Sequence, residues 1–128
     1  MSNIYKNYFK NKNILIFGGT GSFGSAFLKR AINLNFNEIK IFSRDEKKQH
    51  DLRLLYSSQK IKFIIGDIRD RNSVNDACKN VDFVFHAAAL KQVPSCEFYP
   101  MEAVKTNIIG TNNILEGCLE NNVKRIVC

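Results

Sequence analysis

The sequence has no tryptophan and only two prolines, and no apolar run approaches the roughly 18 residues that cross a bilayer. Residues 1–13 lack the apolar core of a secretion signal, so we expect a cytoplasmic protein without membrane contact. The four cysteines show no C-x-x-C spacing, and two histidines offer few further zinc ligands. We therefore expect buried or free thiols and no metal site.

The net charge of +7 is spread along the chain rather than gathered into one basic segment. No aromatic residues alternate with the lysines and arginines as they do in a nucleic-acid stacking surface. The charge therefore indicates a solvated surface and no nucleic-acid partner, and a small phosphate-bearing ligand would account for part of it. With 128 residues, 45% of them hydrophobic, the chain predicts one globular domain over residues 1–128, with residues 1–12 as a tail.

Short apolar runs rich in Ile, Phe and Val alternate with segments whose apolar residues recur at helical spacing. The runs show little polar alternation, which is typical of parallel strands covered on both faces. We therefore predict an α/β fold, a Rossmann-like doubly wound parallel sheet with strand order 3-2-1-4-5 that ends at strand five. The predicted strands are residues 13–17, 38–43, 60–67, 81–90 and 124–128, and the predicted helices are 22–34, 44–56, 73–80 and 101–121.

Helical spacing also predicts which side chains face the core. We expect Ser73 to cap the third helix, with Val74, Ala77 and Cys78 on its apolar face. Two longer apolar faces follow from the same spacing: Phe23, Ala26, Phe27, Ala31 and Leu34 in the first helix, and Val104, Ile108, Leu115 and Cys118 or Leu119 in the last.

A glycine-rich loop, FGGTGSFG at residues 17–24, joins the first predicted strand to the first predicted helix. Its G-x-G-x-x-G spacing in that position is the dinucleotide fingerprint, in which free amides at a helix N-terminus meet a pyrophosphate. The loop has no Gly-Lys-Ser/Thr, which argues against a nucleoside triphosphate site. The predicted cofactor contacts in this loop are Gly18, Thr20, Gly21, Ser22, Phe23 and Gly24.

The second predicted strand ends in Ser43 and Arg44, where a hydroxyl and a guanidinium suit the 2′-phosphate of NADP. Lys47 and Lys48 add positive charge nearby. A carboxylate at this place usually accepts from the ribose 2′-hydroxyl of NAD, so Asp45 keeps NAD open as the alternative.

With the glycine loop, the segments SRDE, GDIRD, HAAALKQVP and MEAVKTNIIGTNNILE occur in order. Together they resemble the N-terminal half of the extended short-chain dehydrogenase/reductase family, over about residues 11–128. More narrowly, the chain is similar to the bacterial UDP-N-acetylglucosamine 4,6-dehydratases and 5-epimerases of capsular and surface polysaccharide synthesis, the CapD-like group. The resemblance implies a UDP-sugar substrate and an enzyme that uses NADP.

The resemblance also implies roles for single residues. His86 alone we interpret as a hydrogen-bonded histidine at a strand end, without a role in the site. The implied contacts are Asp67 and Ile68 with adenine; Ala87, Ala88 and Ala89 beside the phosphates and nicotinamide ribose; Lys91 with the pyrophosphate; Val93 and Pro94 at the sugar; and Asn107 with backbone inside the last helix.

The catalytic Thr-Asp-Lys and Tyr-x-x-x-Lys segments of the family follow strand five, so we expect no catalytic residue in this chain. Tyr8 with Lys12 and Tyr56 with Lys60 have the second spacing, but they precede strands, and we interpret both as chance matches. The chain alone is then an inactive cofactor-binding portion that pairs through helix 101–121 into a homo-oligomer. The alternatives are an enzyme like UDP-glucose 4-epimerase and a non-catalytic dinucleotide-binding module.

Overall fold

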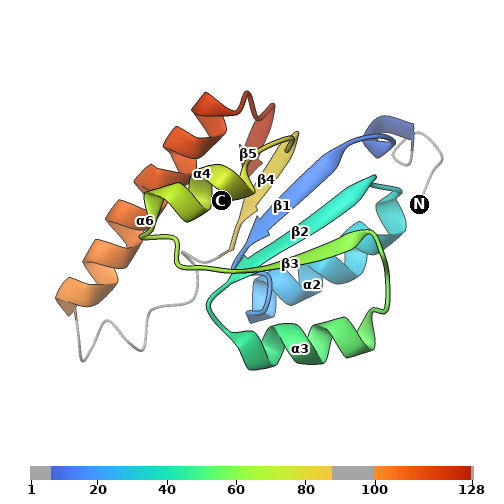
Figure 1. The fold of residues 1–128 in the computed structure, drawn as a ribbon, viewed down its shortest axis with the longest axis horizontal. Coiled ribbons are helices and arrows are strands. Elements are labelled where there is room, and N and C mark those ends of the chain that lie inside the picture. The colour runs from blue at the N-terminus through green and yellow to red at the C-terminus, as the bar shows by residue number, and fades with distance from the viewer. Residues whose placement is uncertain (1–6, 88–99, 128) are drawn as a thin grey trace.

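A computed structural model describes residues 7–87 and 100–127 of the chain. Five parallel strands form one sheet in the order β3-β2-β1-β4-β5, which confirms the predicted topology (Figure 1). The crossing from β3 at one edge back to β4 beside β1 is the change of direction that characterises a doubly wound sheet. The strands are β1 Asn13–Phe17, β2 Glu38–Ser43, β3 Ile61–Ile65, β4 Phe83–His86 and β5 Arg125–Val127.

Helices cover both faces of the sheet (Figure 1). On one face lie α2 (Ser22–Ala31), extended by the 3₁₀ turn η1 (Ile32–Leu34), and α3 (Glu46–Leu55). On the other lie α4 (Arg71–Ala77) and α6 (Pro100–Glu120). The sheet therefore has a separate hydrophobic core on each side, as the continuous apolar strands predicted.

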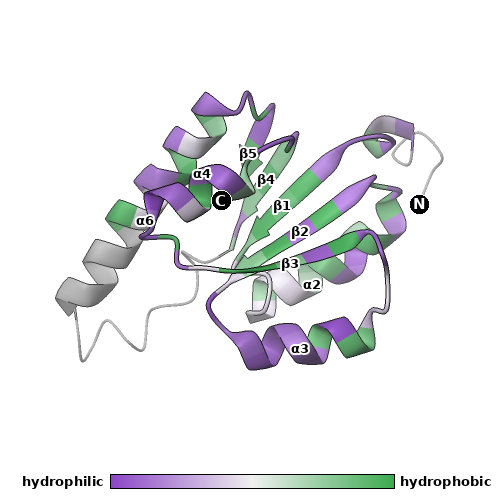
Figure 2. Cartoon of the chain, in the orientation of Figure 1, coloured by the Kyte–Doolittle hydropathy of each residue, from purple (hydrophilic) through white to green (hydrophobic). Residues whose placement is uncertain are grey.

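Strand β1 supplies both cores because successive side chains of a strand point to opposite faces. Ile14 and Ile16 face α2, whereas Leu15 and Phe17 face α4 and α6, and all four are buried. Figure 2 shows hydrophobic residues along β1, β2 and β4 and mostly hydrophilic ones along α3. The centre of the sheet is thus the most deeply buried part of the described chain.

The sheet-facing side of α2 differs from the predicted one. Gly24, Leu28 and Ala31 are its buried residues, whereas Phe23 is 63% exposed and Ala26 is also exposed. A side chain on Gly24 would meet the carbonyl of Gly18, so Gly24 must face the loop. The residues four and seven positions further on then face the sheet, and the prediction that placed Phe23 and Ala26 on the apolar face was wrong.

The cap of α4 is Asp70 rather than the predicted Ser73. The Asp70 carboxylate accepts from the backbone N–H groups of Asn72 and Ser73, while the Ser73 hydroxyl donates to Asp70 Oδ2 over 2.8 Å. Those hydrogen bonds, led by the one from the Ser73 side chain, lower the pKa of Asp70. The predicted apolar face of this helix is confirmed, because Val74, Ala77 and Cys78 are buried.

The long helix α6 carries two different faces in its described part. Ile114 and Cys118 are buried, and Gly110 and Gly117 bring the helix close to Ile68 and Cys78. The outward stripe is apolar but open to solvent: Ile108 is 64% exposed, Leu115 43% and Leu119 79%. The predicted face therefore divides into Cys118, which packs in the core, and a stripe that does not.

Residues 7–12, expected to be a tail, contact the sheet on the α2 side. The Phe9 ring lies 4.7 Å from that of Phe36 and 5.7 Å from that of Phe83, measured between centroids. Tyr8 stacks on Phe83 at 6.1 Å. This segment thus contributes aromatic packing to the face on which α2 lies.

Candidate functional site

The glycine loop makes a tight turn between β1 and α2. Gly18 has φ of 76°, in the region that glycine adopts without steric cost. Its N–H donates to the carbonyl of Phe42 over 2.9 Å, and its carbonyl accepts from the N–H of Gly21 over 3.1 Å. The turn is therefore tied to β2 at one end and closed on itself at the other.

Gly21 and Gly24 are glycines for different reasons. A Cβ on Gly24 would strike the Gly18 carbonyl and lie 2.5 Å from Gly19 Cα, so the packing of α2 against the loop excludes any side chain. Gly21 has φ of −78° and ψ of 178°, an extended conformation open to any residue. Its backbone lines a cavity instead, and a side chain there would take up the space of that cavity.

This cavity has a volume of about 280 Å³ and lies at the N-terminus of α2. The first N–H groups of a helix have no partner within it, and no side chain caps α2, so these amides and the helix dipole favour an anion. The volume suits the phosphates of a ligand rather than a whole dinucleotide. The lining residues are Gly18, Gly21, Ser22, Phe23, Gly24, Lys48 and Ala87.

Two residues reach the cavity from other elements. Lys48 comes from the first turns of α3 and is the only charged residue of the lining described above. Ala87 follows β4, and its N–H donates to the Phe17 carbonyl over 2.9 Å, which continues the ladder between β1 and β4. Thus three predicted parts of the chain, the loop, Lys48 and the first alanine, do meet at one place, whereas Lys47 does not line this cavity.

Thr20, predicted as a loop contact, is 8% exposed.

The residues after β2 are arranged around α3. Ser43 is 9% exposed, and its Oγ accepts from Gln49 Nε2 over 2.9 Å. Arg44 is exposed, with Nη1 3.6 Å from Asp67 Oδ2. The Asp45 carboxylate accepts from the Lys48 N–H over 2.9 Å and caps α3, so this carboxylate already has a structural role.

Asp67, predicted to hold adenine, is bound by Arg69. Arg69 donates from its backbone N–H to Oδ1 over 2.9 Å and from Nη2 to Oδ2 over 2.9 Å, with Nε 3.2 Å from both oxygens. These contacts lower the pKa of Asp67 in spite of its partial burial. Ile68 is buried against Gly110, and its carbonyl accepts from Asn113 Nδ2 over 3.0 Å.

His86 ends β4 and is 1% exposed. Its Nε2 lies 3.2 Å from Thr111 Oγ1, as expected for a hydrogen-bonded histidine at a strand end. Burial lowers the pKa of His86, so the imidazole is neutral near pH 7. Its side chain lies on the α6 side of the sheet and is not part of the cavity lining.

Other predicted site residues fall outside this description. Ala88, Ala89, Lys91, Val93 and Pro94 lie outside the described residues, and of Asn107 only the helical backbone is described. Sequence reasoning missed four polar partners, namely Gln49, Arg69, Thr111 and Asn113.

Within residues 7–87 and 100–127, no group of three or more His, Cys, Asp or Glu side chains is placed to hold a metal ion. Cys78 and Cys118 are buried free thiols, as expected, and Cys96 and Cys128 lie outside that part of the chain. No helix in it has the length and apolarity needed to cross a membrane.

The parallel sheet with a glycine loop between β1 and α2 defines a Rossmann-like protein of the nucleotide-binding type. The chain belongs to the family described as polysaccharide biosynthesis protein, whose sequence profile matches residues 14–128.

Relatives and solved structures agree with this fold. The chain is 58% identical over 123 residues to a protein of Rickettsia bellii (strain OSU 85-389) named UDP-glucose 4-epimerase, a match that covers 93% of this chain and 36% of the relative. The structure of Pen from Bacillus thuringiensis superposes with a TM-score of 0.88 at 40% identity, over 93% of this chain and 38% of Pen. DesIV of Streptomyces venezuelae, a dTDP-glucose 4,6-dehydratase solved with NAD and TYD, shares the fold at a TM-score of 0.79 and 23% identity, over 89% of this chain and 38% of DesIV. The chain thus spans little more than a third of the length of each.

Proposed function

We propose that this chain is the NAD(P)-binding portion of a nucleotide-sugar epimerase or dehydratase. The observation that carries the proposal is the cavity at the N-terminus of α2, where free amides of Ser22 and Phe23, the Cβ-free backbone of Gly21 and the cation of Lys48 converge. An anion fits this donor set, and the place is the one that a dinucleotide pyrophosphate occupies in such sheets. The names of the relatives support the reaction class.

For the cofactor we propose NADP. When bound, NADP would supply a reversible hydride acceptor for C4 of the sugar. The chain's own residues bind and orient: the loop amides and Lys48 hold the pyrophosphate, and Ser43 and Arg44 meet the adenosine ribose. Asp45 Oδ1 is engaged as the cap of α3, and the guanidinium of Arg44 beside it favours a 2′-phosphate. NAD is the alternative, and DesIV was solved with it.

For the sugar we propose UDP-N-acetylglucosamine and a 4,6-dehydratase or 5-epimerase reaction, as the sequence resemblance implies. The name of the Rickettsia relative favours a second candidate, 4-epimerisation of UDP-glucose. Both reactions begin with oxidation at C4, but only dehydration yields a product lighter by one water. A full-length polypeptide that contains this portion is incubated with each sugar nucleotide and NADP, and mass spectrometry of the sugar-nucleotide product separates the two reactions. A product of unchanged mass would contradict the dehydratase. On either reading, the residues Val93 and Pro94 stay predicted contacts of the sugar.

Replacing Gly21 by valine tests the cavity. The extended backbone of Gly21 accepts a side chain, but valine would fill the space of the phosphates, so we expect NADP affinity to fall about a hundredfold. Titration calorimetry measures the loss, and Ala26→Val is the matched control because Ala26 is exposed on the same helix, away from the cavity. Equal heats from wild type and Gly21→Val would contradict the proposed site.

We also propose that copies of the chain pair through the outward stripe of α6. Ile108, Leu115 and Leu119 lie one above another along this helix and are exposed. A carboxylate in a paired apolar surface loses its hydration, so Leu119→Glu should shift the mass measured by light scattering from oligomer to monomer. Leu54→Glu on α3, where Leu54 is 68% exposed, is the control that should leave the mass unchanged. A wild-type monomer at high concentration would contradict the pairing.

A further inference from the structure

Gln49 is a buried polar side chain that sequence reasoning did not assign. It lies in α3 and is 2% exposed. Its Nε2 donates to Ser43 Oγ over 2.9 Å and to the Ile64 carbonyl over 2.8 Å, with the Ser43 carbonyl 3.4 Å away. Three oxygens around one nitrogen fix the orientation of the amide, since a rotated amide would bring its own oxygen against them.

The donor in this contact decides what the Ser43 hydroxyl can do. Because Ser43 Oγ accepts from Gln49, the hydroxyl hydrogen cannot also point toward the amide nitrogen. Gln49 Oε1 does not accept the Ser43 hydroxyl hydrogen either, because Oε1 has no hydrogen-bond partner among the described residues. The hydrogen of Ser43 is therefore left to donate to something other than Gln49.

The position of Ser43 indicates what that acceptor is. Ser43 is the last residue of β2 and stands at the carboxyl edge of the sheet, where ligands of this fold bind. The exposed guanidinium of Arg44 follows it, and Oδ1 of the Asp45 carboxylate is engaged as the cap of α3. A hydroxyl donor beside a cation matches an ionised phosphate, which only accepts hydrogen bonds.

We propose that Gln49 is a positioning residue that holds the Ser43 hydroxyl as a donor toward the 2′-phosphate of NADP, and so contributes to the preference for NADP over NAD. This inference rests on the proposed function of the chain. It adds a selectivity mechanism, because Gln49 would act through Ser43: the Gln49 amide determines whether Ser43 presents a donor or an acceptor at the ribose.

The decisive variant is Gln49→Glu, which keeps the shape and replaces the amide donor by an acceptor. The Ser43 hydroxyl would then turn to donate to the new carboxylate and would no longer serve the phosphate. We expect the dissociation constant for NADP to rise by at least about tenfold and that for NAD by less than about twofold. Titration calorimetry on a full-length polypeptide that contains this portion measures both dissociation constants. Gln59→Glu is the matched control, since Gln59 is an exposed glutamine in the turn between α3 and β3.

A carboxylate at position 49 also repels a phosphate directly, so the effect through Ser43 is isolated by a double-mutant cycle. In the Ser43→Ala background, Gln49→Glu should weaken NADP by a clearly smaller factor than in wild type. The neutral variant Gln49→Met should weaken NADP by about threefold and leave NAD unchanged. Arg44→Ala, which removes the neighbouring guanidinium, provides the reference for a loss confined to NADP.

The outcomes separate the inference from the proposed function. Wild type that binds neither cofactor contradicts both. Wild type that binds NADP, together with a Gln49→Glu variant that weakens both cofactors by the same factor, overturns this inference alone. The inference is also overturned if Gln49→Glu weakens NADP binding by as large a factor in the Ser43→Ala background as in wild type. Thermal unfolding monitors each variant, and if Gln49→Glu does not fold, an unchanged NADP to NAD ratio in Gln49→Met overturns the inference.

Discussion

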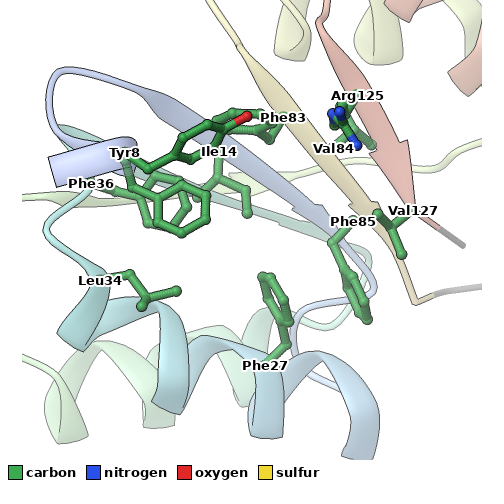
Figure 3. A pocket seen from close by; sticks show the side chains of 11 residues that line it. Tyr8, Ile14, Phe27, Leu34, Phe36, Phe83, Val84, Phe85, Arg125 and Val127 are labelled. Carbon is green, nitrogen blue, oxygen red and sulfur yellow. The ribbon is translucent and has the colours of Figure 1, made fainter. Parts of the chain in front are cut away.

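Two hollows of the molecule, one at the N-terminus of α2 and one beside Phe27 of the same helix, are built in opposite ways. The cavity at the N-terminus of α2 is formed largely by backbone and holds one charged side chain, Lys48. The second hollow, of about 460 Å³, is formed by side chains, and Figure 3 shows Phe27 of α2 and Phe85 of β4 side by side in its lining. Their rings stack with centroids 4.2 Å apart. The residues that line it are Tyr8, Phe9, Ile14, Phe27, Leu34, Phe36, Phe83, Val84, Phe85, Arg125 and Val127.

The two regions therefore place different structural requirements on their residues. Amides that meet an anion must be held in place by the turn, so the loop tolerates few changes even though it buries little apolar surface. The aromatic hollow gains its stability from buried area, which side chains of similar volume can replace. Substitutions should therefore affect ligand binding in the first region and stability alone in the second, except where a loop glycine also supports packing.

The largest effect is expected at Gly24. A methyl group there would strike the Gly18 carbonyl, and neither backbone can move without shifting α2, so Gly24→Ala should lower the free energy of unfolding by about 3 kcal/mol. Gly21→Ala is the matched control in the same loop and should change it by less than about 1 kcal/mol, because its backbone is extended. Urea unfolding measures the free energy of unfolding of both variants. Equal losses would contradict the conclusion that Gly24 is needed for packing and Gly21 for binding.

A smaller effect is expected in the aromatic hollow. Phe85 is half-buried, so Phe85→Ala should cost about 2 kcal/mol, less than a fully buried phenylalanine. Phe85→Leu keeps most of the volume and should cost less than about 1.5 kcal/mol. NADP affinity, measured by calorimetry on the folded variants, should not change. A loss of affinity that matches the loss of stability would show that the two regions are coupled through β4.

The sequence allowed the sheet and the loop to be predicted because their signals are local. The predicted bounds of β1 and β2 agree with the structure at both ends, since the apolar residues of each strand lie close together and polar residues or glycines flank them. The glycine spacing likewise indicated the loop that joins β1 to α2, where the structure has a tight turn. Neither inference needed knowledge of distant contacts.

Features that depend on distant contacts could not be predicted in this way. Asp70 and Ser73 are both good capping residues, and only the direction of the chain before α4 decides between them. Gln49 is buried where its amide meets the carbonyl groups of Ser43 and Ile64, and Arg69 binds the carboxylate of Asp67, whose contact with adenine stays a prediction. Each of these pairings joins residues whose proximity follows from tertiary structure or from the exact course of a turn.

Strand β4 connects the two regions through three successive residues. Phe85 lines the aromatic hollow and Ala87 lines the cavity, while His86 between them points to the other face, where Nε2 lies 3.2 Å from Thr111 Oγ1. His86 is 1% exposed, and burial lowers the pKa of its imidazole because the interior disfavours the charged form. The unfolded chain, with a histidine pKa of about 6.5, therefore binds a proton at a pH where the folded chain does not.

The smallest effect is thus a dependence of stability on pH. The contribution of neutral His86 is fully present above pH of about 6.5 and is lost as the pH falls toward its lowered folded pKa, at no more than about 1.4 kcal/mol per pH unit. Asp67 and Asp70, whose pKa values are also lowered, act only in more acidic solution, below pH of about 4. Urea unfolding between pH 7 and about pH 5 should give a flatter profile for His86→Asn than for wild type. His50→Asn, at an exposed position, serves as the control, and parallel slopes for wild type and His86→Asn would show that β4 carries no such proton linkage.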